Sequence, residues 1–299
     1  MKVGFVGLGN MGEPMATNLL KAGFELTVND VRTELKEKML ELGASWADTA
    51  KQVAQASEVF ITSLPKPSDV EEVALGEEGL LAGASESDIF LDMSTNFPAT
   101  IKKIAEKAKA KGVTMLDAPV SGGVRGAKRG TLTIMVGGDE SSFKKCQKIL
   151  EVLGEHIYFV GGLGAGTVAK LVNNLLALAN IAIAAEGMVL GVKAGVDPMR
   201  LFEVIDASTG TSFAFKGLFP NIIFKGRFEP PTFSIGLASK DLQLAVDYAK
   251  EMNLPMSLGS EVLKTYESAK AKGLDNKDVG AVITLLEEAA GIEVRTAQQ

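Results

Sequence analysis

A glycine-rich loop near the start of the chain constrains the fold more than any other segment. The apolar run KVGFVG at residues 2–7 predicts a buried strand, the loop GLGNMG overlaps its end, and residues 11–22 have a helical period. In such a strand–turn–helix unit, Gly7 permits the tight turn, Gly9 lets a phosphate approach the backbone, and Gly12 lets the helix pack close to the strand. The unit therefore predicts an α/β domain that binds a dinucleotide pyrophosphate at a helix N-terminus.

An acidic residue after the second predicted strand indicates which dinucleotide this is. Asp30 follows the loop at about 20 residues, where a carboxylate bonds the ribose hydroxyls of NAD. Arg32 would either pair with the 2′-phosphate of NADP or point into solvent. We expect NAD as the cofactor, with NADP possible. The expected binding residues in this part of the chain are Gly7, Leu8, Gly9, Asn10, Met11, Gly12, Asp30 and Arg32.

The two halves of the chain differ in their hydrophobic pattern. Strand-like runs at 2–7, 25–30, 58–65, 88–95, 114–120, 132–138 and 157–161 alternate with segments of helical period. This alternation predicts a parallel sheet covered on both faces. After Gly166 we expect only helices, which begin near Asp197, Ser239, Ser257 and Asn276. We expect a dinucleotide-binding domain at 1–163 and an all-helical domain at 164–299, joined by a long helix at about 167–193.

Composition indicates a soluble protein without nucleic acid or membrane partners. Of the 299 residues, 46% are hydrophobic and 23% charged, and the net charge of −6 comes without a basic block. The most membrane-like run, 171–192, contains asparagines and Glu186 and is expected to be a helix buried in protein. The single cysteine, Cys146, allows no internal disulfide and suits the reducing cytoplasm, where we expect the protein. The only histidine, His156, is expected in a turn, and one histidine excludes a multi-histidine metal site.

Three further loops follow predicted strands, at the edge where ligands of such sheets bind. Leu64 and Pro65 follow the third strand, and Ser94 and Thr95 follow the fourth. The segment DAPVSGG at 117–123 follows the next strand, and its Ser-Gly-Gly turn presents one hydroxyl and several open N–H groups. We expect Ser121, Gly122 and Gly123 to bind the carboxylate of a small acid, with an ordinary glycine-rich turn as the alternative.

A lysine in the first turns of the long helix is the candidate acid/base. Lys170, Asn173 and Asn174 share one face of an otherwise apolar helix that starts at the expected domain junction. A partly desolvated lysine near a helix N-terminus should have a lowered pKa, which suits proton transfer to a carbonyl or from an alcohol. Lys170 would supply the electrophilic assistance itself, so no metal is needed for this chemistry.

Four motifs together resemble the β-hydroxyacid dehydrogenases, the family of 3-hydroxyisobutyrate dehydrogenase and tartronate semialdehyde reductase. They are GFVGLGNMGEPMATNLLKAG at 4–23, DAPVSGGVRGAKRGTLTIMVGG at 117–138, GAGTVAKLVNN at 164–174 and SKDLQLA at 239–245. The resemblance covers essentially the whole chain and implies an N-terminal Rossmann domain followed by an all-helical domain across a long interdomain helix. It also implies small carboxylate-bearing hydroxy acids or semialdehydes as substrates, and a homodimer or homotetramer.

The resemblance assigns roles to individual residues. Lys170 matches the catalytic lysine and Asn174 the asparagine that orients it and the substrate. Ser121, Gly122 and Gly123 match the substrate-carboxylate site. Thr95 and Lys240 match positions near the nicotinamide, Asp241 stands beside them at the substrate, and Leu64 and Pro65 match a dinucleotide contact. Asp30 matches the acid of NAD-using members, although NDVRTE partly resembles the NADP-preferring pattern NRT.

Other enzyme classes fit the sequence less well. Imine reductases share the fold but usually carry Asp or Tyr in place of Lys170, and a non-catalytic dinucleotide-binding module would be expected to lose this lysine. 6-Phosphogluconate dehydrogenases carry a histidine near the lysine, which is missing at 166–178. The Tyr266-x-x-x-Lys270 spacing of short-chain dehydrogenases lies in the helical half and is interpreted as chance. The sequence leaves open which acid is the substrate, which direction of the reaction is physiological, and the subunit number.

Overall fold

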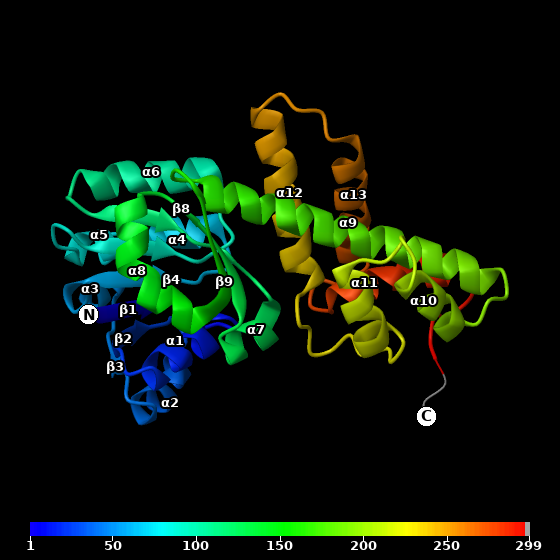
Figure 1. Ribbon diagram of the computed structural model, residues 1–299, viewed down its shortest axis with the longest axis horizontal. Helices are drawn as coiled ribbons and strands as arrows, with labels where there is room; N and C mark the ends of the chain where they lie inside the picture. The colour runs from blue at the N-terminus through cyan, green and yellow to red at the C-terminus, as the bar shows by residue number, and fades with distance from the viewer. Residues whose placement is uncertain (297–299) are drawn as a thin grey trace. The chain divides into compact units, whose positions relative to one another are not determined.

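A mostly parallel β-sheet forms the centre of the N-terminal unit in the computed structural model, which describes residues 1–296 (Figure 1). The chain divides into one unit from Met1 to Lys170 and a second from Leu171 onward. The strands are β1 Lys2–Val6, β2 Glu25–Asn29, β3 Ser45–Trp46, β4 Val59–Thr62, β5 Ile89–Asp92, β6 Thr114–Asp117, β7 Val120–Ser121, β8 Leu132–Gly137 and β9 Gly154–Gly161. They run in the order β3-β2-β1-β4-β5-β6-β8-β7, and β9 pairs with β8. The expected Rossmann-type domain is therefore confirmed.

Helices cover both faces of the sheet, because its strands alternate side chains between two cores. Phe5 and Ile61 point into one core and their neighbours Val6 and Phe60 into the other. The first core is closed by α1 Gly12–Lys21, α2 Lys36–Glu41, α7 Gly123–Arg129 and α8 Glu140–Leu153. The second is closed by α3 Ala50–Gln55, α4 Pro67–Leu75, α5 Leu80–Gly83 and α6 Pro98–Lys109. A short turn, η1 Thr33–Leu35, precedes α2.

The last strands of the sheet depart from the purely parallel arrangement expected. Strands β1 to β6 pair in parallel, but β8 is antiparallel to both β6 and β7. The reason is that β7 and β8 form a hairpin connected through α7, so the chain returns in the opposite direction. Strand β9 is parallel to β8 and contains His156, paired in register with Thr133. The expectation that His156 lies in a turn was wrong.

The second unit contains helices only, apart from an isolated bridge, within the part of the chain that the structure describes. They are α9 Ala165–Lys193, which begins in the first unit, α10 Pro198–Asp206, α11 Phe213–Leu218, η2 Phe219–Ile223, α12 Ile235–Glu251, α13 Ser257–Ala271, η3 Val279–Ile283 and α14 Thr284–Ala290. One core joins α9 to α12 and α13, and a second, rich in phenylalanine, joins α9 to α11 and η2. The all-helical C-terminal domain is thus confirmed.

The expected helix starts agree with the structure at two positions and differ at two. Asp197 caps α10 by accepting a hydrogen bond from Arg200 N at 3.0 Å, and α13 begins at Ser257. Helix α12 begins four residues before Ser239, because the Ser234 hydroxyl already accepts a hydrogen bond from Leu237 N at 3.3 Å. The helical turn expected near Asn276 begins only at Val279.

Helix α9 is less buried than its sequence indicated. It is long and apolar enough to cross a membrane, and 33% of its most apolar window is buried. Length and composition of this kind also suit a core helix, and Leu178 and Met188 belong to the two helical cores. The expectation of a helix buried in protein was therefore only partly right. Exposed apolar side chains remain along it, and they include Val172, Leu176, Ile183 and Leu190.

The single thiol lies in the first core, and this placement predicts its reactivity. Cys146 on α8 is fully buried, and burial raises the pKa of its thiol to about 12. Because the thiolate is the reactive form, we expect iodoacetamide at pH 8 to label the native protein about 10³-fold more slowly than the urea-unfolded chain. The measurement is mass spectrometry of timed samples. Native labelling at the rate of the unfolded chain would contradict this placement.

Candidate active site

The predicted cofactor residues of the N-terminal unit follow strands that end at one edge of the sheet. The glycine-rich loop follows β1, Asp30 follows β2, Leu64 and Pro65 follow β4, and Ser94 and Thr95 follow β5. Since β1, β2, β4 and β5 are parallel neighbours, their carboxyl ends share this edge. The topology therefore brings together loops that are far apart in the sequence.

The glycine-rich loop has the shape that a pyrophosphate needs. Gly7 has a φ of 95°, and a Cβ on it would lie 2.4 Å from Ser63 O. A Cβ on Gly12 would lie 1.8 Å from Gly7 O, so only glycine lets α1 pack this closely on the loop. At Gly9, by contrast, no described atom lies within 4 Å of such a Cβ. The open space at Gly9, at the N-terminus of α1, fits the backbone approach of a phosphate group.

Asp30 joins the glycine-rich loop to Arg32. Its Oδ2 accepts a hydrogen bond from Leu8 N at 2.6 Å, and its Oδ1 accepts from Arg32 N at 2.8 Å and Arg32 Nε at 3.1 Å. The Arg32 guanidinium also donates to Leu8 O at 2.9 Å. Burial alone would raise the pKa of Asp30, but the hydrogen bonds from Arg32 and Leu8 outweigh it and lower the pKa. Asp30 is therefore held ionised, with Arg32 folded onto it.

The loops after β4 and β5 are joined by a buried polar network that sequence reasoning missed. Ser94 Oγ accepts a hydrogen bond from Leu64 N at 2.9 Å, which links two predicted cofactor residues. Beneath them, Asp92 accepts hydrogen bonds from Thr62 Oγ1 at 2.8 Å, Ser94 N at 3.1 Å and Asn96 Nδ2 at 2.8 Å. Burial raises the pKa of Asp92, and these hydrogen bonds oppose the rise. An acid directly after a buried apolar run was the signal available in the sequence.

The predicted carboxylate-binding turn lies where β7 passes into α7. Ser121 ends β7, Gly122 precedes the helix with a φ of 124°, and Gly123 begins it with a φ of 61°. Ser121 is half-buried, whereas Gly122 and Gly123 are exposed. A helix N-terminus formed by glycines leaves its N–H groups open to an anion, because no Cβ stands in front of them. The backbone of this turn is compatible with the predicted role.

The candidate acid/base and its neighbours lie on two helices. Lys170 and Asn174 are 9% and 7% exposed and lie four residues apart on α9, on one face of the helix. In the helical unit, Asn174 Nδ2 donates to Asp241 Oδ2 at 2.6 Å. Lys240 Nζ lies 2.8 Å from Asp241 Oδ1 and forms an ion pair with it. The geometry of this contact is not that of a hydrogen bond, and Oδ1 has no hydrogen-bond partner among the described residues. The structure thus brings Asn174, Lys240 and Asp241 together within this unit.

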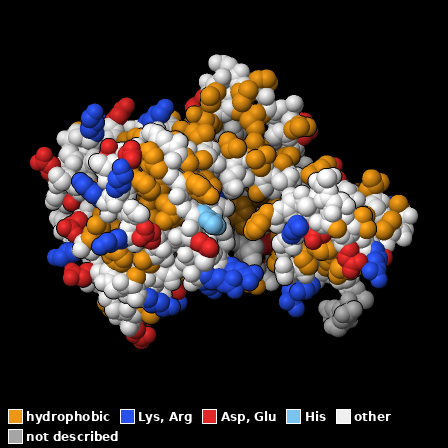
Figure 2. All heavy atoms as spheres, viewed as in Figure 1, with side chains coloured by type: hydrophobic (Ala, Val, Ile, Leu, Met, Phe, Trp, Pro, Cys, Tyr) orange, Lys and Arg blue, Asp and Glu red, His pale blue; other side chains and the backbone are white. Residues whose placement is uncertain are grey.

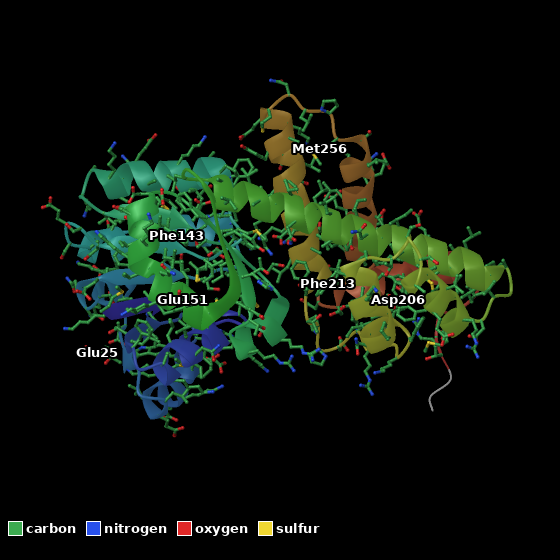
Figure 3. The ribbon with its side chains drawn as sticks, in the orientation of Figure 1. Glu25, Phe143, Glu151, Asp206, Phe213 and Met256 are labelled. Carbon is green, nitrogen blue, oxygen red and sulfur yellow. The ribbon has the colours of Figure 1, made fainter. Side chains whose placement is uncertain are left out.

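Two aromatic residues of the helical unit differ in their exposure. Phe213, the first residue of α11, is 95% exposed (Figure 3), and the preceding Ser212 caps that helix. Tyr266 is fully buried in the helical core and donates to Leu178 O at 3.2 Å, so its spacing to Lys270 has a structural explanation.

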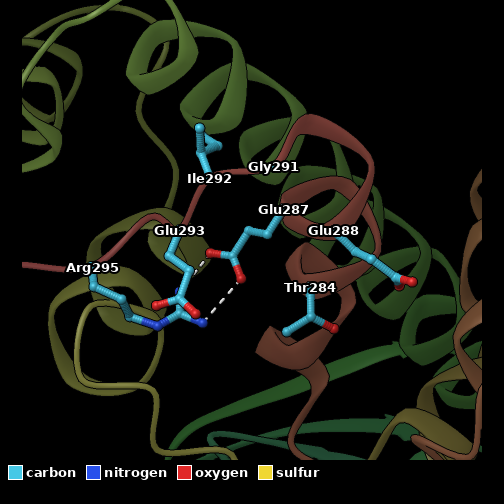
Figure 4. Close-up of a pocket in the computed structure, with 7 residues that line it drawn as sticks. All are labelled: Thr284, Glu287, Glu288, Gly291, Ile292, Glu293 and Arg295. Atoms are coloured by element: carbon cyan, nitrogen blue, oxygen red, sulfur yellow. Dashed lines mark hydrogen bonds and ion pairs between the residues drawn. The ribbon is translucent and has the colours of Figure 1, made fainter.

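Among the surface pockets that the described residues form are the following two. A pocket of about 570 Å³ near the C-terminus is lined by Glu287, Glu288, Glu293 and Arg295 among others (Figure 4). Arg295 is held there by Glu287, and the lining contains no predicted site residue. A second pocket of about 510 Å³, on α1, includes Asn10 from the glycine-rich loop.

The fold and the strand-edge loops define an NAD(P)-dependent oxidoreductase with a Rossmann domain. Residues 2–162 match the family model for the NAD binding domain of 6-phosphogluconate dehydrogenase. Residues 164–286 match the model for the NAD-binding domain of NADP-dependent 3-hydroxyisobutyrate dehydrogenase. The chain belongs to the β-hydroxyacid dehydrogenase family.

The chain is similar to individual relatives over nearly the whole length of both chains. The chain is 41% identical to a 2-(hydroxymethyl)glutarate dehydrogenase of Eubacterium barkeri, over 100% of this chain and 99% of that one. It is 41% identical to a 3-hydroxyisobutyrate dehydrogenase of Pseudomonas aeruginosa, over 91% and 95% of the two chains. A solved Mycobacterium tuberculosis 3-hydroxyisobutyrate dehydrogenase with L-serine superposes with a TM-score of 0.87 at 33% identity, over 95% and 98%. The chain is accordingly an NAD(P)-dependent enzyme of the 3-hydroxyisobutyrate dehydrogenase type.

The Asp30–Arg32 pair predicts how cofactor preference changes on mutation. Asp30→Ala removes the carboxylate expected to bond the ribose hydroxyls and frees Arg32 to pair with a 2′-phosphate. We expect the ratio of the Kd for NADPH to that for NADH to fall at least about tenfold. This corresponds to a change of about 1.4 kcal/mol in the difference between the two binding free energies. Isothermal titration calorimetry with both dinucleotides measures it, with the exposed Asp48→Ala as control. An equal loss of affinity for both would show that Asp30 does not select the cofactor.

Proposed function

We propose that the enzyme transfers a hydride between its nicotinamide cofactor and a short β-hydroxy acid or carboxylic acid semialdehyde, with Lys170 as general acid/base. The observation that carries the proposal is a lysine only 9% exposed on an apolar helix, one helical turn from the equally buried Asn174. A lysine amine on the same buried helix face as a polar asparagine suits a group that gives up and regains a proton. The family supports a hydroxy acid as substrate.

In the direction of oxidation, each part of the site has one task. The Ser121 hydroxyl and the N–H groups of Gly122 and Gly123 bind the substrate carboxylate. The bound nicotinamide supplies the hydride acceptor for this direction and the hydride donor for the reverse. The neutral Lys170 amine takes the alcohol proton as the carbon–oxygen double bond forms, and in reduction the ammonium returns that proton to the carbonyl oxygen. Asn174, held by Asp241, orients the substrate and the lysine.

A substrate panel with a matched pair of lysine variants tests this proposal. We would measure nicotinamide oxidation and reduction with 3-hydroxyisobutyrate, 2-(hydroxymethyl)glutarate and tartronate semialdehyde, using NAD(H) and NADP(H) in parallel. Lys170→Ala should lower kcat at least about 10²-fold, the scale of a lost general acid/base, and leave the dinucleotide Kd within about threefold. Lys193→Ala, at the far end of the same helix, is the control and should keep wild-type turnover.

Two outcomes would count against the proposal. Substantial turnover by Lys170→Ala would remove the acid/base role. No turnover of any carboxylated substrate by the wild-type protein, despite tight dinucleotide binding, would favour imine reduction or a non-catalytic role.

We also propose that the protein is a homodimer or homotetramer in which α9 contacts a second copy. Val172, Leu176, Ile183 and Leu190 are 50%, 58%, 63% and 72% exposed, and their spacing places them on one stripe of the helix. Apolar side chains also gather on the face of the molecule in view in Figure 2. A continuous apolar stripe on a long helix is typical of a protein interface, because burying it against another copy removes it from water.

A charge placed in the stripe tests the interface. We expect Ile183→Asp to shift the mass measured by sedimentation equilibrium to that of a smaller species, because an aspartate buried in an apolar interface lacks a partner. Ser268→Asp introduces the same charge at an exposed position of α13 and should leave the mass unchanged. A monomeric wild-type protein, or an Ile183→Asp variant with wild-type mass, would contradict the proposed interface.

A further inference from the structure

A buried aspartate at the end of β6 binds the beginning of α9. Asp117 has no exposed surface, and its Oδ1 accepts a hydrogen bond from Gly164 N at 2.7 Å. Its Oδ2 accepts from Thr167 N at 2.6 Å and from Thr167 Oγ1 at 2.9 Å. One carboxylate thus fixes both the residue before the helix and its third residue. All three bonds lie within the N-terminal unit.

The surroundings of this carboxylate leave it no room to move. A Cβ on Gly137 of β8 would lie 2.6 Å from Asp117 Oδ1. A Cβ on Gly166 of α9 would lie 2.2 Å from Met135 O and 3.1 Å from Asp117 Oδ2. Glycines therefore stand where any larger residue would push the sheet and the helix apart. The carboxylate is enclosed between β8 and the first turn of α9.

The chemistry of a helix N-terminus explains why a carboxylate serves here. The first N–H groups of a helix have no acceptor within the helix, and the helix dipole favours negative charge at this end. The two oxygens of a carboxyl group can accept several hydrogen bonds at once, which suits these N–H groups. Burial raises the pKa of Asp117, whereas the hydrogen bonds from Gly164 and Thr167 oppose the rise. The cost of burying the acid is thus offset only while the first turn of α9 stays in place.

Lys170 stands three residues after Thr167, so the first turn of α9 sets the position of its Cα. We propose that Asp117 is a positioning residue, which holds the first turn of α9 on the end of β6 and thereby fixes where Lys170 presents its amine. This inference rests on the acid/base role proposed for Lys170. A shift of about 1 Å in a catalytic group can cost about 10²-fold in rate, so a rigid anchor one turn away from the lysine has a large effect.

The neighbouring strand supplies a matched control. Asp92 lies beside Asp117 in the register of β5 and β6 and is equally buried. Its partners are Thr62 at the end of β4 and Ser94 and Asn96 in the loop after β5, and it has no hydrogen bond to α9 among the described residues. The two acids share their burial and sheet position but bind different segments. A comparison of their variants therefore separates the anchoring of α9 from the general effect of losing a buried carboxylate.

Hydrogen–deuterium exchange tests the anchor without any substrate. In Asp117→Asn, the amide can still accept from Gly164 N, but its NH₂ group then faces the Thr167 N–H and hydroxyl and cannot replace the lost acceptor. We expect the peptide 162–171 to exchange about tenfold faster or more. The same peptide in Asp92→Asn should exchange within about twofold of wild type. Unchanged exchange of this peptide in Asp117→Asn would overturn the proposal.

Steady-state kinetics then test whether the anchor acts through the lysine. With whichever panel substrate the wild type turns over, Asp117→Asn should lower kcat about 10- to 100-fold and leave the Kd for the dinucleotide within about threefold. Faster exchange with unchanged kcat, or an equal loss in kcat and dinucleotide binding, would overturn the positioning role. Retained turnover by Lys170→Ala would instead remove the role of the lysine, and the exchange result would still report whether Asp117 holds α9.

Variants at Thr167 keep the test informative if Asp117→Asn does not fold. Thr167→Val removes only the hydroxyl bond to Oδ2 and keeps the backbone N–H bond. We expect a fall in kcat of about three- to tenfold, in proportion to one lost hydrogen bond. Thr167→Ser restores the hydroxyl and should restore kcat. Equal kcat values for the valine and serine variants would overturn the role assigned to this bond.

Discussion

Acidic side chains buried at the ends of parallel strands hold the functional edge of this molecule together. Asp30, Asp92 and Asp117 follow or end β2, β5 and β6, and each accepts a hydrogen bond from a residue distant in sequence, namely Leu8, Thr62 and Gly164 respectively. Burying a carboxylate costs several kcal/mol unless its oxygens are hydrogen-bonded. Each loop is therefore fixed in the conformation that satisfies its acid, and any other conformation would leave buried oxygen atoms without hydrogen-bond partners. The sheet supplies the positions, and the acids determine the conformations of the loops.

Helix α9 has three different functions along its length. Its first turn is bound to Asp117, its second and third turns present Lys170 and Asn174, and its remaining length supplies apolar residues to the helical cores. A helix that is polar at one end and apolar over most of its length cannot show a simple amphipathic period. This explains why the segment resembles a membrane span by composition, although one of its faces packs in both helical cores.

The spacing of apolar residues along the sequence predicted those features of the fold that depend on residues close together in the chain. The strands, the glycine-rich loop and the α/β-then-helical order follow from period-2 and period-3.6 patterns, and the structure confirms them. The two-residue strands β3 and β7 are too short to show a period, and the direction of β8 depends on the hairpin through α7. The start of α12 was misplaced because two serines, Ser234 and Ser239, are both plausible caps in the sequence. The domain boundary at 163/164 and the individual site roles stay predictions.

The polar networks were not predictable for a different reason. Thr62 and Asn96 bind Asp92, and Gly164 and Thr167 bind Asp117, across 30 to 50 residues in most cases. No single-sequence period encodes which acid meets which loop, since this depends on strand order and register. The sequence does show an acid directly after each of two buried apolar runs. An unpaired acid at such a position is costly, so its presence alone indicates that partners come from elsewhere in the chain.

The same edge explains how an acidic protein binds anionic ligands. The net charge of −6 would repel a dinucleotide and a carboxylate, but charges beyond about 8–10 Å are screened at physiological ionic strength. At short range, helices α1, α4 and α6 begin after the short loops that follow β1, β4 and β5, so their N-terminal N–H groups gather where the ligands are expected. Proline at the first position of α4 and α6 is tolerated because that N–H needs no helical partner. Local dipoles at the edge, rather than overall charge, therefore decide which ions this surface attracts.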